Sequence, residues 1–284
     1  MSDEAALSDE AERSEFEADT AVERRGDGRW RGEATRRWDV VGGAPNGGYL
    51  LTLPLRALAA ELDRPDPLTV TAHFLDACGP GPVEISTEVL RTGRHATGRA
   101  VLAQADDEPG RARLTVTATF GDLGDADGPT RVDAEPPELP PLEECVDPAA
   151  AEVELPPIVR RFDLRLDPSC VGWAVGRPSG VGRMAGWLRF GDGHPIDTMA
   201  LPLLADALPP PALNLIPEVA WVPTLELTTH VRARPAPGWL RTVFRTRYLV
   251  DGYLEEDGEL WDAEGRLVAL SRQLALVRTR PAET

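Results

Sequence analysis

The sequence predicts an α+β fold made of two copies of one unit, in which a helix is followed by an antiparallel β-meander. Two apolar stretches, 51–58 (LTLPLRAL) and 199–208 (MALPLLADAL), contain the same Leu-Pro-Leu string. The strand-like segments that follow them also match, because 71–74 (TAHF) returns as 228–231 (TTHV). A repeat of both helix and strands indicates that one structural unit was duplicated within the chain.

The first copy is predicted to begin near Phe16, after an acidic and disordered tail over residues 1–15. The glycine-rich segment 42–48 opens a helix predicted over 47–62. Period-two alternation and intervening turn residues predict the strands of this copy. They are 21–25, 30–35, 68–75, 83–91, 99–105 and 111–120.

A domain boundary is predicted over residues 121–157, which are rich in proline and acidic residues and lack a periodic apolar face. The N-terminal unit then spans 16–120 and the C-terminal unit 158–284. The second helix is predicted over 199–208, directly before three prolines. The predicted strands of this copy are 159–166, 183–190, 224–232, 239–250, 252–261 and 266–278.

Charge and composition exclude several classes of function. The 284 residues carry a formal net charge of −17, which disfavours binding to nucleic acid or to an anionic membrane. No lysine occurs, so Schiff-base chemistry, pyridoxal phosphate attachment and a Walker A site are excluded. The acidic N-terminus and the lack of a long apolar run predict a cytoplasmic protein with no membrane partner.

The second copy gains polar residues where the first has apolar ones. Alternation in 111–120 places Ala118 on the inward face of its strand, and the repeat puts Gln273 at the matching position. In the same way Asp206 replaces Leu58 and Thr224 replaces Pro67. Because buried polar groups destabilise a fold unless they are hydrogen-bonded, these three residues form a candidate site. A satisfied buried polar cluster is the alternative explanation.

Other reactive side chains are less informative. Cys78, Cys145 and Cys170 are widely spaced, which favours free thiols in a reducing compartment over disulfides. His194 and Asp197 offer two potential metal ligands, too few for a site, and we expect neither a metal nor a cofactor.

The residues resemble the acyl-CoA thioesterase II family of the hotdog superfamily, with two hotdog units fused in one chain. The resemblance extends over 16–280, and its most recognisable strings are 38–49, 204–207, 223–226 and 271–273. It implies a double hotdog, in which each unit is a long helix wrapped by an antiparallel sheet. It also implies that Asp206, Thr224 and Gln273 hold the hydrolytic water, with acyl-CoA as the substrate. Such a fused pair can be a monomer, a pseudo-dimer that supplies its own interface, or can assemble further into a homo-oligomer.

Thioester hydrolysis also needs donors for the developing oxyanion. The backbone N–H groups of Gly47 and Gly48 are candidates, because they lie where the positive end of the first helix is predicted. A tight turn with unusual backbone angles is an equal alternative explanation for these glycines.

Two other functions remain open. The segment 191–197 (GDGHPID) looks like the signature of hotdog enoyl-CoA hydratases, but Asp197 stands where those enzymes have a second catalytic His. The third possibility is a module that binds acyl-CoA without catalysis.

Overall fold

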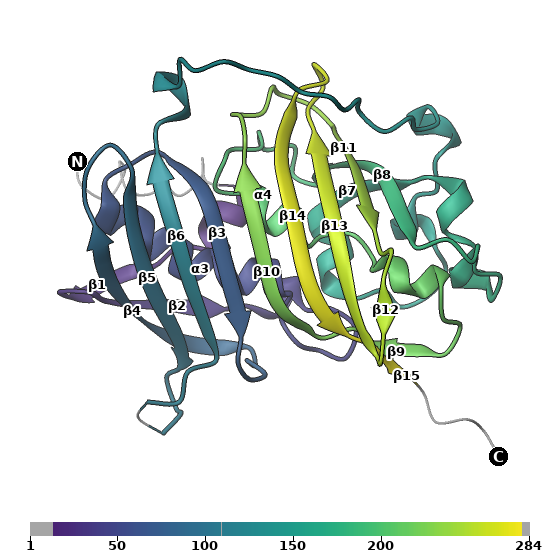
Figure 1. The fold of residues 1–284 in the computed structure, drawn as a ribbon. Helices are drawn as coiled ribbons and strands as arrows, with labels where there is room; N and C mark the ends of the chain where they lie inside the picture. The colour runs from purple at the N-terminus through teal and green to yellow at the C-terminus, as the bar shows by residue number, and fades with distance from the viewer. Residues whose placement is uncertain (1–13, 109, 280–284) are drawn as a thin grey trace, which may run out of the picture.

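A single antiparallel sheet of 13 strands runs through both halves of the chain in the computed structural model, which describes residues 14–108 and 110–279. The strand order is β1-β2-β4-β5-β6-β3-β10-β14-β13-β11-β8-β7, with β12 paired to β13. The helices α3 and α4 lie together on one face of this sheet (Figure 1). This arrangement confirms the predicted double hotdog.

The strands of the first half agree closely with the prediction. They are β1 (Glu23–Gly26), β2 (Arg29–Ala34), β3 (Asp66–Phe74), β4 (Gly81–Arg91), β5 (Ala96–Gln104) and β6 (Leu114–Gly121). Their inward side chains, such as Val83, Leu102 and Val116, are buried against α3. The alternation that predicted the strands is therefore the alternation that builds the core.

Helix α3 (Gly47–Leu62) has the predicted bounds and is mostly buried. Its N-terminus is fixed by aromatic packing, because Tyr49 stacks on Trp38 with a centroid separation of 5.3 Å. The Tyr49 hydroxyl accepts a hydrogen bond from the backbone N–H of Thr35 and donates one to the carbonyl oxygen of Asp19. The start of this helix is thus held rigidly, which matters because it lies at the candidate site.

The two halves meet along β3 and β10 (Thr224–Val231) with a pseudo-two-fold relation. Thr71 lies opposite Thr228, and their hydroxyl oxygens are 2.9 Å apart. On one side of this pair His73 faces Glu226, and on the other Thr69 faces His230. The equivalent strands of a duplicated unit therefore join as the subunits of a symmetric dimer would.

The other strands of the second half follow the predicted meander. They are β7 (Phe162–Leu166), β8 (Arg183–Phe190), β9 (Val219–Trp221), β11 (Leu240–Arg245), β12 (Leu249–Val250), β13 (Tyr253–Trp261), β14 (Leu267–Leu276) and β15 (Arg278–Thr279). The sequence did not predict the small separate sheet formed by β9 and β15. The predicted strand over 239–250 is interrupted, because Arg247 and Tyr248 donate their backbone N–H groups to the Glu255 side chain.

The second helix is much shorter than predicted. Helix α4 spans only Leu201–Leu204, against the expected 199–208, so the long helix belongs to the first half alone. Pro202 lies in its first turn, where a missing N–H removes no helical hydrogen bond. The repeated Leu-Pro-Leu string identified equivalent positions correctly, but it did not indicate how far each helix extends.

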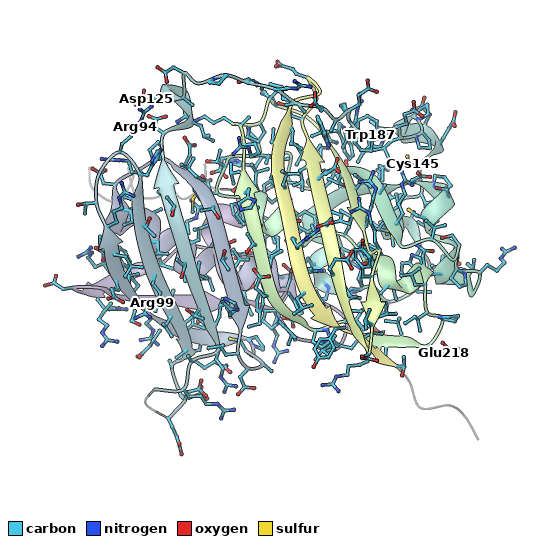
Figure 2. All side chains as sticks on the ribbon, in the orientation of Figure 1. Arg94, Arg99, Asp125, Cys145, Trp187 and Glu218 are labelled. Atoms are coloured by element: carbon cyan, nitrogen blue, oxygen red, sulfur yellow. The ribbon has the colours of Figure 1, made fainter. Side chains whose placement is uncertain are left out.

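The predicted linker crosses one end of the sheet and is held against both halves (Figure 1). Near its start, Arg94 donates to the carbonyl oxygen of Asp125 at 3.0 Å. Farther along, the Trp187 indole donates to the carbonyl oxygen of Pro140 at 3.0 Å. Figure 2 labels Arg94 and Asp125 at the first of these contacts and Trp187 at the second.

Structure at the N-terminal side begins with helix α2 (Glu15–Asp19), which Ser14 caps through the backbone N–H of Glu17. Phe16 of this helix is buried and stacks on Phe190 of the second half. Residues 1–13 of the predicted tail lie outside the described residues.

Candidate active site

Asp206 follows α4 by two residues and is held by the other half of the chain. Its Oδ2 accepts hydrogen bonds from the Asn46 side-chain amide at 3.0 Å and from the backbone N–H of Gly48 at 2.8 Å. Asn46 also donates to the carbonyl oxygen of Asp206 at 3.0 Å. Two donors on Oδ2 leave Oδ1 as the oxygen able to bind another molecule.

Asn46 is a residue of the site that the sequence analysis did not assign. Its Oδ1 accepts from the backbone N–H of Tyr49 at 2.9 Å and so caps α3, while its Nδ2 holds Asp206. Because each end of the amide has its own partner, the orientation of the side chain is fixed. An Asn directly before a predicted helix is the signal from which the cap could have been found.

Burial raises the pKa of Asp206 from 3.8 to about 6, and the hydrogen bonds from Gly48 and Asn46 limit the rise. The residue as a whole keeps a little exposed surface, so solvent can still reach it. A carboxyl group with this pKa is mostly ionised at neutral pH yet basic enough to accept a proton. The positive end of α3 further favours the charged form.

Thr224 and Gln273 lie together, as the repeat predicted. Thr224 is the first residue of β10 and lies opposite Ala275 of β14, ahead of a bulge that ends at Glu226. The same irregularity follows Pro67 in the first half, which supports the predicted equivalence of these positions. The Thr224 hydroxyl donates to Gln273 Oε1 at 3.0 Å, so the amide NH₂ of Gln273 is the end of the side chain that can donate to other groups.

Asp206 joins these two residues by packing rather than by direct bonding. Helix α4 packs on β10 and β14, the strands that carry Thr224 and Gln273. Within residues 14–108 and 110–279 no hydrogen bond links Asp206 to either of them. The segment that leads into Asp206 therefore lies against the two strands that carry Thr224 and Gln273.

Glu256 is a second carboxyl group of this region, and the sequence analysis missed it. It lies on β13 directly opposite Gln273 and is only 6% exposed. Burial, and then the neighbouring charge of Asp206, raise the pKa of Glu256 from 4.5 to about 8, against a lowering effect of hydrogen bonding to Gln273. Glu256 could have been found from strand pairing. Gly98 faces Ala118 in the first half, and Glu256 faces Gln273 at the equivalent positions of the second half.

The first half has an apolar version of the same arrangement. A Cβ atom on Gly98 would lie 2.7 Å from Leu58 Cδ2, so the Leu58 side chain fills the space beside that strand. Leu58 and Ala118 are fully or almost fully buried. Polar side chains therefore occupy these positions in the second half, whereas the first half has apolar residues there.

The two glycines at the start of α3 are there for space and not for unusual backbone angles. Neither has a positive φ, although Gly42 and Gly43 before them do. A Cβ on Gly48 would lie 2.9 Å from Asp206 Cβ and 2.9 Å from Leu203 Cα. The alternative explanation, a tight turn with unusual backbone angles, is thus wrong for these two glycines. The close approach of α3 and the α4 segment requires glycine instead.

Of the two predicted oxyanion donors, only Gly47 keeps an available N–H. The N–H of Gly48 donates to Asp206, and those of Tyr49 and Leu50 donate to Asn46. In the described part of the chain, the N–H of Gly47 has no acceptor. A Cβ on Gly47 would lie 3.1 Å from Asp206 Oδ2, so this residue lies close to the carboxylate.

The remaining candidates of the sequence analysis have other roles. Asp197 accepts from the backbone N–H of Ala200 at 2.8 Å and caps the turn before α4. His194 lies 3.6 Å from Glu17, a residue of α2. The three cysteines are free, and burial raises the pKa of Cys78 to about 11, which disfavours a reactive thiolate.

No group of three His, Cys, Asp or Glu side chains suited to a metal ion occurs in the described ranges. In those same ranges, no helix has the length and apolar character needed to cross a membrane.

Comparison with known families gives matches to both halves. Residues 34–121 match the model of the acyl-CoA thioesterase N-terminal domain, and residues 134–277 match that of the acyl-CoA thioesterase C-terminal domain.

Individual relatives cover nearly the whole chain. The structure of a proposed thioesterase II from Thermobifida fusca YX is 34% identical, with a TM-score of 0.82 over 94% of this chain and 98% of that one. A hotdog-fold protein of unknown function from Alicyclobacillus acidocaldarius is 22% identical, with a TM-score of 0.81 over 95% of this chain and 100% of that one. An uncharacterised protein of Mycobacterium tuberculosis strain H37Rv is 28% identical over 273 residues, 87% of this chain and 90% of that protein.

Proposed function

Since this chain belongs to the acyl-CoA thioesterase family, we propose that it hydrolyses an acyl-CoA thioester to the free acid and CoA, with a water held by Asp206, Thr224 and Gln273. The observation that carries the proposal is the anchoring of Asp206. Two donors fix Oδ2, while Oδ1 stays available to accept a hydrogen bond from water. The donor NH₂ of Gln273 can hold the same water from the sheet side.

In the proposed reaction Asp206 first takes a proton from water and later gives it to the leaving group. Asp206 accepts a proton as the water oxygen attacks the carbonyl carbon of the thioester. The tetrahedral intermediate collapses with cleavage of the C–S bond, and the proton held by Asp206 passes to the departing CoA thiolate. The developing oxyanion receives a hydrogen bond from the N–H of Gly47, at the positive end of α3.

The direct test is release of free CoA thiol from a panel of acyl-CoA substrates of increasing chain length. We expect turnover by the wild-type protein on part of the panel, which also identifies the preferred acyl group. Asp206→Asn should lower kcat by a factor on the order of 100 to 10,000, because the general base is lost. A folded Asp206→Asn protein with wild-type turnover would sink the assignment.

Two controls separate the other functions. Hydration of crotonyl-CoA without thiol release would favour the hydratase, for which the segment 191–197 is the only sequence support. Tight binding of acyl-CoA with no thiol release over hours would favour the non-catalytic module.

A further inference from the structure

Three neighbouring strands, and the residue that follows a fourth, present a row of polar side chains to the face of the sheet on which α4 packs. Thr224 of β10, Gln273 of β14 and Glu256 of β13 are three members of this row. Thr246 is the fourth, because it follows Arg245 of β11, which lies opposite Asp257. We call these four residues the polar row.

Two adjoining members of the polar row, Glu256 and Thr246, carry polar atoms that lack a hydrogen-bond partner in the described part of the chain. Glu256 and Thr246 are each 6% exposed. Glu256 Oε2 and Thr246 Oγ1 have no hydrogen-bond partner in the part of the chain that the structure describes. A buried polar atom without a partner destabilises a fold, so these atoms call for an explanation beyond packing.

The surroundings of Glu256 disfavour a second negative charge. From the α4 side it faces Asp206, which is itself a carboxylate. β14 presents Gln273 and Ser271 on this face, β11 presents Phe244, and Thr246 follows the end of β11; all four are uncharged. Asp257 belongs to the opposite face, where Arg272 and Arg247 pair with it.

We propose that Glu256 is a positioning residue of the active site: in its protonated form it holds the amide of Gln273, and by staying uncharged it leaves Asp206 as the single carboxylate of the pair. The inference rests on the proposed thioesterase function and extends it. Thr224 donates to Gln273 Oε1, so the other end of the amide is the end that Glu256 fixes. The apolar counterparts Gly98, Ala118 and Leu58 in the first half cannot supply such support.

A pH dependence follows from this arrangement. Raising the pH through about 8 ionises Glu256 and places a second negative charge beside Asp206 and the developing oxyanion. Turnover should therefore fall on the alkaline side because of Glu256, and on the acid side because of Asp206.

The experiment measures kcat and KM against pH for the wild type, Glu256→Gln, Glu256→Leu and Glu259→Gln. Glu256→Gln mimics the protonated acid, so we expect kcat at pH 7 within about threefold of wild type and no alkaline decline below pH 9. Glu256→Leu should lower kcat at least tenfold with KM little changed, because Gln273 loses its support. Glu259→Gln is the matched control, since Glu259 lies on the same strand but pairs with Arg245 away from the polar row, and it should keep the wild-type profile.

An infrared titration makes the test independent of turnover. The C=O stretch of a protonated carboxyl group should persist at pH 7, disappear as the pH passes about 8, and be absent from Glu256→Gln. An alkaline decline that survives in Glu256→Gln, or a wild-type kcat in Glu256→Leu, would overturn the inference. If the wild type releases no thiol from any acyl-CoA, the proposed function fails, whereas the infrared band still decides the protonation of Glu256.

Discussion

The side-chain amide of Asn46 binds the carboxylate of Asp206 across 160 residues of sequence, at 3.0 Å. One residue belongs to the first half of the duplication and the other to the second. The acid that the second half gained is therefore oriented by the helix cap of the first half. The site is a property of the joined pair, and a separated second half would lack the donors that hold its carboxylate.

Asn46→Asp should shift the acid side of the pH–activity profile upward. The new carboxylate can still cap α3 through the N–H of Tyr49, but it removes a donor to Asp206 and adds a like charge beside it. The pKa of Asp206 then rises above 6, so activity appears at higher pH than in the wild type. The measurement is kcat/KM between pH 5 and 9, with Asn46→Ser as a control that keeps a cap without adding charge. An unchanged acid limb in Asn46→Asp would mean that Asn46 does not tune Asp206.

Gly48→Ala should destabilise the protein by about 1–3 kcal/mol through overpacking. The added methyl group would lie 2.9 Å from Leu203 Cα, a backbone atom that cannot move aside cheaply. Urea unfolding gives the comparison, with Gly128→Ala as the control because nothing lies within 4 Å of a Cβ at that position. Equal stability of the two variants would contradict the close helix contact.

Thr224→Val should lower kcat by roughly 10- to 100-fold, because it leaves the Gln273 carbonyl oxygen without its donor. Thr97→Val is the matched control in the first half, where it breaks a hydroxyl contact of 3.0 Å with Thr119. Kinetics of both variants at pH 7 provide the measurement, and only Thr224→Val should lose activity. Similar losses in the two would show that the effect is a general one on the sheet.

Stability should depend on pH through Glu256, and the sign is fixed by the raised pKa. The native protein binds this proton up to about pH 8, whereas the unfolded chain releases it near 4.5. The stabilisation is full below pH 4.5 and is lost as the pH rises toward 8, by about 1.4 kcal/mol per pH unit. Unfolding free energies of wild type and Glu256→Gln at pH 5, 7 and 8.5 test this, because Asp206 titrates in both proteins and its effect largely cancels. A difference between the two proteins that is constant with pH would contradict an ionisable, buried Glu256.

Much of the fold could be predicted from the sequence, because alternation and turn residues act locally. Helix α3 and strand β8 have the predicted bounds, and the repeat identified Thr224 and Gln273 as neighbours before any distance was known. The length of α4 could not be predicted in this way. Apolar composition over 199–208 fits a buried turn as well as a buried helix, and packing between the halves decides which one forms.

Two residues of the site escaped prediction for a different reason. The role of Glu256 depends on which residue of β14 lies opposite it, and a one-residue change of register would turn it to the other face. The second role of Asn46 depends on the approach of Asp206 from a distant part of the chain. Local patterns carry neither kind of information, whereas the comparison of strand pairs between the two halves does.

The most direct measurement of the central claim is a single turnover of acyl-CoA in H₂¹⁸O with enzyme in excess. If a water held by Asp206 attacks the thioester, the free acid contains one ¹⁸O atom from the solvent and Asp206 contains none. If Asp206 attacked the thioester itself, water would cleave the resulting anhydride, and ¹⁸O could enter the Asp206 carboxylate. We predict label in the acid alone, and label in the peptide that contains Asp206 would contradict the account.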